Sequence, residues 1–326
     1  MALNKIKTIG IMTSGGDSPG MNPCIRAIVR MGLANEINVL GIDEGYEGLI
    51  HGKFRPLGAR DVGGIMQRGG TILQTARSTE FRTPQGQREA IRSLNNAQID
   101  ALVVIGGDGS LNGALVLSEQ GIPVVGIPGS IDNDIYGTDM CIGVDTALNT
   151  IVDAIDKLRD TASSHNRAFL VETMGRSSGY LAMHAGIICG AEMVLIPEID
   201  TPIEEVASCV EEAYKRGKTH CIIVVAEGHK PSTAEIARTL ESMDIGFTTR
   251  VTILGHIQRG GKPSAFDRML ATRFGVKAVE FLVAGQTGIM TGLDGRNIVP
   301  IPLKTVVSTA PVTPMEYYEM ARILAR

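Results

Sequence analysis

The sequence predicts an α/β fold built on mostly parallel sheets with helices on both faces. Short runs rich in Val and Ile alternate with segments of helical period along most of the 326 residues. These runs are apolar throughout, which is typical of parallel strands buried on both faces. A chain of this length suits either two domains or one large α/β unit.

The alternation can be followed in order along the chain. Predicted strands occupy residues 7–13, 38–43, 100–107, 123–129, 167–175, 193–198 and 220–228. Predicted helices occupy residues 22–35, 110–120, 146–162, 177–191 and 202–217. No low-complexity stretch or flexible linker interrupts them, so composition marks no clean domain boundary.

The charge and the aromatic content argue against a nucleic-acid partner. A net charge of -4 gives no general attraction to phosphate polymers. The chain has no Trp and only 4% aromatic residues, which leaves little surface on which bases could stack. Any bound anion therefore has to be held by locally gathered arginines.

The cysteine and hydropathy patterns indicate a soluble, cytoplasmic protein with no membrane partner. No C-x-x-C spacing suggests a zinc or redox site, and no run of about 18 apolar residues suggests a membrane span. We expect the five cysteines to be small buried side chains in a reducing compartment: Cys24, Cys141, Cys189, Cys209 and Cys221.

Two glycine-rich loops lead from a predicted strand into a predicted helix: TSGGDSPGMN, residues 13–22, and IGGDGSLNG, residues 105–113. Glycine lets backbone N–H groups approach an anion, and the helix N-terminus adds partial positive charge, so both loops suit phosphate. A tight turn with Asp or Ser as helix cap is the alternative. Neither loop is a Walker A motif, and Gly107, Gly109 and Gly113 are spaced one residue too far for G-x-G-x-x-G.

Without a lysine in either loop, a polyphosphate needs cations from elsewhere in the chain. Several arginines stand beside glycine at predicted strand ends or loops, where a guanidinium can clamp phosphate with paired donors. One such arginine alone is more often solvated surface. The set as a whole favours anion binding: Arg68, Arg77, Arg82, Arg167, Arg176, Arg250 and Arg259.

The stretch PGSIDND, residues 128–134, places two carboxylates just after a predicted strand. In phosphoryl transfer one carboxylate accepts the proton of the attacking hydroxyl, while another holds the magnesium ion that bridges the phosphates. Asp132 suits the first role, and Asp108, in the loop one strand earlier, suits the second. A calcium site or a turn with capped amides stays open, although the spacing lacks an EF-hand pattern.

A series of motifs resembles a known enzyme family. In chain order they are TSGGDSPGMN, RGGT, TAR, EFR, IGGDGS, PGSIDND, SSHNR, ETMGR, AEG and LGHIQRGG. Together, over roughly residues 5–290, they resemble the bacterial ATP-dependent 6-phosphofructokinases. The resemblance implies a glycolytic kinase that uses Mg²⁺ and transfers the γ-phosphoryl group of ATP to the 1-hydroxyl of fructose 6-phosphate.

The resemblance also implies two Rossmann-like lobes. The larger, ATP-binding domain would comprise residues 1–142 plus 257–305. The smaller, sugar-phosphate-binding domain would comprise residues 143–256 plus 306–326.

Individual residues receive roles from the same resemblance. It implies that Asp132 is the general base beside Ser130 and Asp134, where Ser130 replaces the usual Thr, and that Arg77 and Arg176 stabilise the transferring group. The nucleotide positions are Gly16, Arg77, Arg82, Gly107, Asp108, Gly109 and Ser110, with Asp108 as the metal ligand. The sugar contacts are Met174, Gly175, Arg176 and Glu227, and the 6-phosphate cradle is Arg167, Arg250, His256 and Arg259.

Two of these residues also have simpler explanations. His256 could be a strand-end residue that only makes local hydrogen bonds. Glu227 ends the apolar run 220–228, where we expect an unpaired carboxylate to be costly unless a sugar hydroxyl or a cation satisfies it.

Two glycines indicate which phosphoryl donor the chain uses. Pyrophosphate-dependent relatives typically carry Asp and Lys where this chain has Gly109 and Gly129, and an Asp at 109 would repel the α-phosphate of ATP. ATP is therefore favoured, and a pyrophosphate-dependent enzyme is the nearest alternative. NAD and lipid kinases share only the GGDG loop. A non-catalytic, two-lobed sugar-binding protein should show an export signal and stacking aromatics, which this sequence lacks.

Family resemblance further implies a homotetramer in which Arg167 and Arg250 reach into the sugar site of a neighbouring subunit. A second anion site, for ADP or phosphoenolpyruvate, would use Arg26, Arg30, Arg159, Glu192, Arg216, Lys218 and His220. Three positions depart from the pattern: Ala59 replaces an arginine, Gly64 an acid and Thr219 a basic residue. We therefore expect effector control to be weak or altered.

Overall fold

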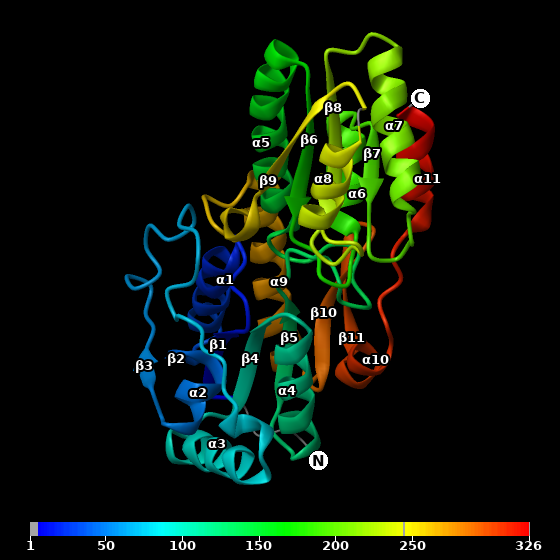
Figure 1. Cartoon of the computed structure of the whole chain (residues 1–326). Helices are drawn as coiled ribbons and strands as arrows, with labels where there is room; N and C mark the ends of the chain where they lie inside the picture. Colours follow the sequence, from blue (N-terminus) through cyan, green and yellow to red (C-terminus); the bar gives the residue numbers. More distant parts are fainter. Residues whose placement is uncertain (1–5, 244, 326) are drawn as a thin grey trace. The chain divides into compact units, whose positions relative to one another are not determined.

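The computed structural model describes residues 6–243 and 245–325 and confirms the predicted α/β class with mainly parallel sheets (Figure 1). The chain forms two compact units. The first takes in the chain up to Ile131, then Ile135–Thr146 and Arg259–Pro311. The second takes in Asp132–Asp134, Ala147–Gln258 and the chain from Val312 onwards.

The first unit is built on a seven-stranded sheet of order β11-β10-β5-β4-β1-β2-β3. The strands are β1 (Thr8–Ser14), β2 (Asn38–Ile42), β3 (Phe54–Pro56), β4 (Ala101–Gly106), β5 (Val124–Pro128), β10 (Ile289–Asp294) and β11 (Asn297–Pro302). Neighbours in the central part run parallel, and only the edge strands β3 and β11 pair antiparallel. A doubly wound arrangement results, with β1 near the centre.

Both faces of this sheet are covered by helices. On one face Ile11 and Val103 belong to the same buried cluster as Ile28 of α1 (Met21–Ala34) and Phe274 of α9 (Ala265–Val283). The other face is covered by helices that include α4 (Asp108–Glu119) and α10 (Leu303–Ser308), because a Cβ on Gly126 of β5 would touch Leu111 and Leu303. The remaining elements are α2 (Gly45–Ile50), η1 (Glu80–Arg82) and α3 (Pro84–Asn96).

The second unit contains a parallel four-stranded sheet of order β7-β8-β6-β9. Its strands are β6 (Arg167–Thr173), β7 (Met193–Leu195), β8 (His220–Ala226) and β9 (Thr248–Ile253). Its helical elements are α5 (Val144–His165), which starts in the first unit, α6 (Tyr180–Cys189), α7 (Ile203–Lys215), α8 (Thr233–Ser242), η2 (Gly255–Arg259) and α11 (Met315–Leu324). Helices α7 and α8 share a buried cluster with the sheet, and α11 packs against α6.

Because the strands run parallel, the loops that follow them gather at one edge of each sheet, which is where open α/β sheets bind ligands. In the first unit this edge carries the loops after β1, β4 and β5. The strand ends there approach closely, since a Cβ on Gly106 would lie 2.4 Å from the backbone oxygen of Ser14. In the second unit the corresponding edge carries the loops after β6 and β8.

Four of the five cysteines are buried, as the sequence predicts: Cys24, Cys141, Cys189 and Cys221. The expectation of burial is wrong for Cys209, which is partly exposed because α7 turns it toward a surface pocket. Among residues 6–243 and 245–325, none of the helices has the length and apolar character needed to cross a membrane.

Candidate active site

The loop after β4 leads directly into helix α4 and leaves open space around two glycines. Gly107 is the N-cap of α4, and no side chain caps the helix there. A Cβ on Gly109 would meet no atom within 4 Å, and one on Gly107 would make only an ordinary contact with Gly129. Packing of the chain therefore does not require glycine at these positions, whereas a bound group close to the backbone would.

Asp108 and Ser110 lie in the first turn of the same helix. Asp108 is exposed and Ser110 is buried. The first N–H groups of an α-helix have no carbonyl partner within the helix and attract negative charge. A carboxylate in this turn therefore faces an anion only if a cation lies between them, and Mg²⁺ usually binds one or two carboxylates together with substrate phosphates. A single Asp108 side chain fits that donor set.

Residues 71–82 are tied to the loop that follows β1. Thr75 donates a hydrogen bond of 2.7 Å from Oγ1 to the backbone oxygen of Gly15, and Thr13 Oγ1 reaches the Gln74 oxygen at 2.8 Å. These bonds hold the segment that carries Arg77 and Arg82 beside the Gly15–Gly16 loop. Both arginine side chains are exposed.

Arg259 packs against the loop after β1, within the first unit. Its Nη1 donates to the backbone oxygen of Asp17 at 3.2 Å, and a Cβ on Gly16 would lie 2.5 Å from the same nitrogen. Gly16 thus leaves room for the guanidinium. The resemblance assigned Arg259 to the 6-phosphate, and the structure adds this contact with a loop assigned to the nucleotide.

The PGSIDND loop crosses from one unit to the other. Its first part is fixed to the first sheet, since Gly129 N–H donates to the Gly106 oxygen at 2.9 Å. Asp132 belongs to the second unit, where its backbone oxygen accepts a hydrogen bond of 3.0 Å from Ser178 Oγ. Ser130, Asp132 and Asp134 are all half-buried, and the Oδ1 atom of Asp132 is shielded from solvent.

In the second unit the ends of β6 and β8 are joined by backbone hydrogen bonds. Glu227 N–H donates to the Thr173 oxygen at 2.9 Å, and Gly228 N–H donates to the Gly175 oxygen at 3.2 Å. Gly175 has φ 128°, and a Cβ on Gly228 would lie 1.9 Å from the backbone oxygen of Arg176. Only glycine allows this approach, which brings Glu227 beside Gly175 and Arg176.

Burial differs among the predicted sugar contacts. Met174 is 8% exposed, whereas Arg176, Glu227 and His256 are exposed. The expectation that Glu227 needs a partner to offset burial is therefore wrong, because its carboxylate reaches solvent at the strand end. An exposed carboxylate and guanidinium on the same edge are available to a polar ligand.

Arg167 and Arg250 lie away from this edge. Arg167 is the first residue of β6, and Met174 follows the last. Seven positions separate them, which is about 23 Å in a strand that rises about 3.3 Å per residue. Arg250 pairs in register with Phe169, also in the first half of β6. Within one chain these two arginines therefore cannot meet Met174 and Arg176.

The residues of the predicted effector site fall into two groups. Arg26 and Arg30 lie on α1 in the first unit. The others gather in the second unit: Arg159, Glu192, Arg216, Lys218 and His220. There Lys218 Nζ lies 2.9 Å from Glu192 Oε1, and Ile222 N–H donates to Glu192 Oε2 at 2.7 Å.

Burial and the surrounding charges both act on the pKa of His220. Burial lowers the pKa of His220, and the positive charges of Arg159 and Lys218 lower it further against the opposing effect of Glu192. Arg216 instead pairs with Glu212 at 2.7 Å on α7. At this end of β8, two of the cations are therefore paired with carboxylates, Lys218 with Glu192 and Arg216 with Glu212.

Sequence reasoning missed Gln258, which positions a predicted sugar contact. Its side chain is fully buried, accepts from Met174 N–H at 3.2 Å and donates to the Gly255 oxygen at 2.9 Å. It stands between His256 and Arg259 in the LGHIQRGG motif, and this position in the motif is the signal by which the sequence could have indicated it.

A second cluster was also missed. Among the described residues, Glu47, His51 and Glu80 form the one group of three that could share a metal ion, and Asp108 is not part of it.

Comparison with known proteins shows the family of the chain. A family model described as Phosphofructokinase matches residues 8–282. The ATP-dependent 6-phosphofructokinase of Thermotoga neapolitana is 52% identical over 321 residues, which cover 98% of this chain and 100% of that protein. The enzyme of the same name from Bacillus subtilis is 48% identical over 320 residues, with the same coverage of 98% and 100%.

Comparison of the fold with solved structures also identifies a phosphofructokinase. The structure of phosphofructokinase from Saccharomyces cerevisiae superposes with a TM-score of 0.86 at 41% identity, covering 92% of this chain and 45% of that chain. The family model alone spans most of the sequence, and it includes the glycine-rich loops, the PGSIDND loop and the ends of β6 and β8. The chain therefore belongs to the phosphofructokinase family.

Proposed function

We propose that the chain is an ATP-dependent 6-phosphofructokinase, a glycolytic kinase. It transfers the γ-phosphoryl group of ATP to the 1-hydroxyl of fructose 6-phosphate and gives fructose 1,6-bisphosphate and ADP. The observation that carries the proposal is identity of about half to proteins of that name over their whole length, 52% in Thermotoga neapolitana and 48% in Bacillus subtilis.

The first unit holds the nucleotide in this proposal. ATP phosphates lie against the loop Gly107–Ser110 and the N-terminus of α4, with Gly16 on the loop after β1. Open space at Gly109 supports this, because a phosphate can approach the backbone there. Arg77 and Arg82 supply positive charge, and Asp108 is the magnesium ligand. When bound, Mg²⁺ neutralises charge that develops on the phosphates.

Asp132 is the general base. It accepts the proton of the sugar 1-hydroxyl as that oxygen attacks phosphorus, and Ser130 and Asp134 lie beside it. A positioned base contributes roughly 10²–10⁴-fold to rate. Arg77 and Arg176 stabilise charge on the transferring group, a role worth on the order of 10³-fold or more where arginines perform it.

The second unit holds fructose 6-phosphate. Met174, Gly175, Arg176 and Glu227 contact the sugar, and His256 and Arg259 contact the 6-phosphate together with Arg167 and Arg250. Arg167 and Arg250 lie far from Met174 along β6 and β9, which supports their binding the 6-phosphate in the site of a neighbouring subunit. The proposal therefore includes a homotetramer with substrate sites shared between subunits.

ATP rather than pyrophosphate is the donor. A side chain at position 109 would extend into the open space beside α4, which supports a role for glycine in admitting the α-phosphate of a nucleotide. ADP or phosphoenolpyruvate acts as effector through Arg26, Arg30 and the cluster around Glu192. Because Ala59, Gly64 and Thr219 depart from the pattern, that control is weak or altered.

A donor assay tests the proposal. Purified protein is incubated with fructose 6-phosphate, Mg²⁺ and either ATP or pyrophosphate, and fructose 1,6-bisphosphate is measured. We expect product with ATP and at least about a hundredfold less with pyrophosphate, a difference of roughly 2.7 kcal/mol in transition-state stabilisation. Equal turnover with pyrophosphate would overturn the choice of donor, and no product with either would overturn the activity.

A further inference from the structure

Two cysteines of the second unit lie against each other beneath helix α7. Cys221 is on β8, is fully buried, and belongs to the same core cluster as Val206 and Val210 of α7. Cys209 is the residue of α7 next to Val210, and the Cys221 thiol is near enough to lower the pKa of Cys209. The helix therefore holds the two cysteines in the same part of the unit, where α7 covers β8.

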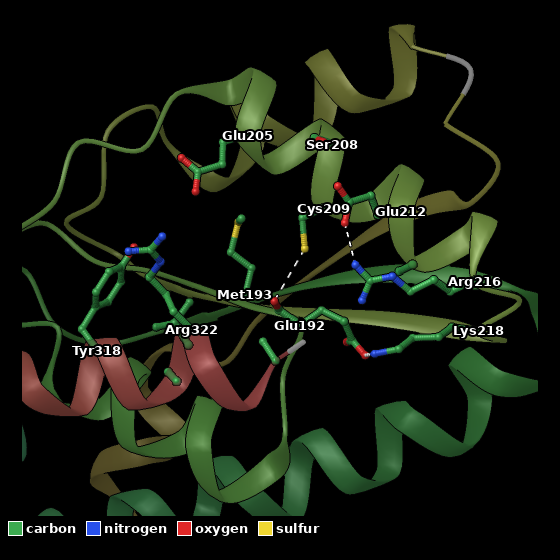
Figure 2. A pocket seen from close by; sticks show the side chains of 14 residues that line it. Glu192, Met193, Glu205, Ser208, Cys209, Glu212, Arg216, Lys218, Tyr318 and Arg322 are labelled. Atoms are coloured by element: carbon green, nitrogen blue, oxygen red, sulfur yellow. Dashed lines mark hydrogen bonds and ion pairs between the residues drawn. The ribbon is translucent and has the colours of Figure 1, made fainter.

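Glu192 fixes this geometry from the side. Cys209 Sγ donates to the backbone oxygen of Glu192 at 3.6 Å, as the dashed line in Figure 2 marks. Glu192 is itself bound to the residue after Cys221, because its N–H donates to the Ile222 oxygen at 2.9 Å and its carboxylate accepts from Ile222 N–H at 2.7 Å. Cys209 thus contacts the residue that pairs with Ile222, the neighbour of Cys221 on β8.

Cys209 is also open to small molecules, whereas Cys221 is not. A pocket of about 290 Å³ opens between α7 and α11, and Cys209 lines it together with Glu212, Tyr318 and Arg322. In Figure 2 the sulfur of Cys209 points from α7 toward Glu192 across this pocket. A reagent the size of a peroxide can therefore reach Cys209 first.

The accessible thiol, Cys209, also has the lower pKa of the two. The hydrogen bond from the Cys221 thiol lowers the pKa of Cys209, aided by Lys218 and opposed by burial, Glu192 and Glu212. The same bond raises the pKa of Cys221, and burial raises it further. By contrast, burial alone raises the pKa of Cys24, and it is the main cause that raises that of Cys189 to about 11.

We propose that Cys209 and Cys221 form a two-thiol oxidation site, in which Cys209 reacts with a hydroperoxide and Cys221 resolves the product as an intramolecular disulfide. An accessible thiol beside a second thiol is the arrangement typical of cysteines that are oxidised reversibly. The site is separate from the phosphoryl-transfer residues, and it does not depend on the kinase reaction.

The chemistry balances with hydrogen peroxide as the oxidant. The Cys209 thiolate attacks one peroxide oxygen, the S–O bond forms, the O–O bond breaks, and hydroxide leaves and takes up a proton. The sulfur of Cys221 then attacks the sulfenic acid, the S–S bond forms, the S–O bond breaks, and water leaves with the proton of Cys221. Two thiols lose two electrons, and one peroxide is reduced to two waters.

A peptide map of the oxidised protein tests the proposal directly. The full-length protein is treated with hydrogen peroxide, its free thiols are alkylated, and it is digested with trypsin and glutamyl endopeptidase. These proteases place Cys209 in residues 206–211 and Cys221 in residues 219–227, apart from Cys189. We expect a disulfide between these two peptides and a fall from five free thiols to about three per chain, reversed by dithiothreitol.

Variants separate the two roles. In Cys221→Ala we expect a dimedone adduct on Cys209 and no disulfide, because the sulfenic acid lacks its partner. In Cys209→Ala we expect peroxide to consume thiols at least about tenfold more slowly than in the wild type. Cys141→Ala, another buried cysteine, should leave the disulfide unchanged.

Three results would overturn the site. They are a wild-type map with Cys209 and Cys221 both free after peroxide, oxidation of Cys24 or Cys189 at the same rate as Cys209, or unchanged thiol loss in Cys209→Ala. The map of the wild type needs no substitution, so it decides the question even if a variant fails to fold.

Discussion

Arg250 on β9 lies directly opposite Phe169 on β6, five positions before Met174. At about 3.3 Å per residue this is about 17 Å of strand, more than an arginine side chain can cover. A phosphate bound beside Met174 is therefore out of reach of Arg250 in the same chain. The two can serve one substrate only if the arginine comes from another subunit.

Mixed oligomers of two inactive variants test this sharing. We expect Arg250→Ala and Asp132→Asn each to be nearly inactive alone, since one lacks a phosphate ligand and the other the base. In oligomers that contain both, an Arg250→Ala chain keeps its Asp132 and receives Arg250 from its neighbour. Random mixing should restore roughly a quarter of the sites, because each site draws on two chains.

Co-expression with two different affinity tags isolates the mixed oligomers for assay. A mixture of Asp132→Asn with Asp134→Asn is the control, since both residues lie in one loop and should not complement each other. Activity no higher than that of the separate variants would show that Arg250 serves its own chain.

Gly109→Asp should impair the use of ATP without impairing the fold. No atom lies within 4 Å of a Cβ at this position, so the side chain adds no clash, but its charge would repel the nucleotide phosphates. We expect the KM for ATP to rise at least about tenfold, about 1.4 kcal/mol. Asn95→Asp, at the exposed end of α3, adds the same charge elsewhere and should leave KM unchanged.

Steady-state kinetics and a thermal melt check this prediction together. An unchanged KM for ATP in Gly109→Asp would place the nucleotide elsewhere, and a large loss of Tm would show that the glycine serves packing instead.

Gln258 should act on sugar binding through Met174. In Gln258→Leu the buried N–H of Met174 loses its acceptor, which costs about 1–3 kcal/mol. We expect the KM for fructose 6-phosphate to rise by a larger factor than kcat falls, since Gln258 positions a contact and does not touch the reacting atoms. Gln258→Glu keeps an acceptor and should recover part of the affinity, whereas equal losses in both variants would indicate a general structural effect.

His184 should make stability depend on pH. It stacks on Tyr180 at 3.9 Å and lies 4.6 Å from the ring of Tyr317 on α11. Burial lowers the pKa of His184 in the folded chain, against a hydrogen bond to the Tyr180 oxygen. The unfolded chain therefore binds the proton more readily, and stability is lost as pH falls below the unfolded value of about 6.5.

Thermal melts at about pH 7.5 and about pH 5.5 measure this effect. We expect Tm to fall more in the wild type than in His184→Phe, which keeps an aromatic ring but cannot titrate. Equal falls would mean that His184 contributes nothing to the pH dependence.

The fold could be predicted because the composition of its strands indicates where they are buried. Both β4 and β8 are apolar at nearly every position, and both prove to be buried parallel strands with helices on two faces. The structure adds a reason for two glycines, since a Cβ on Gly106 or Gly228 would collide with backbone. The apolar pattern of a strand is local, so a single sequence carries it, whereas the contacts of these glycines with Ser14 and Arg176 are long-range.

Exposure and long-range pairing could not be predicted in the same way. Cys209 reads as an apolar helix residue, yet its exposure is set by the neighbouring α11, far away in the sequence. Glu227 follows a buried strand but reaches solvent because the chain turns at Gly228. The position of Arg250 opposite Phe169 depends on strand register, which the sequence of β9 alone does not specify.

The most direct test of the account measures kcat and fructose 6-phosphate affinity for Asp132→Asn beside the wild type. Asp153→Asn, an exposed acid on α5, is the matched control and should behave like the wild type. We expect Asp132→Asn to bind the sugar phosphate normally and to turn over at least about a hundredfold more slowly, because the hydroxyl proton has no acceptor. Turnover within a few-fold of the wild type would contradict it.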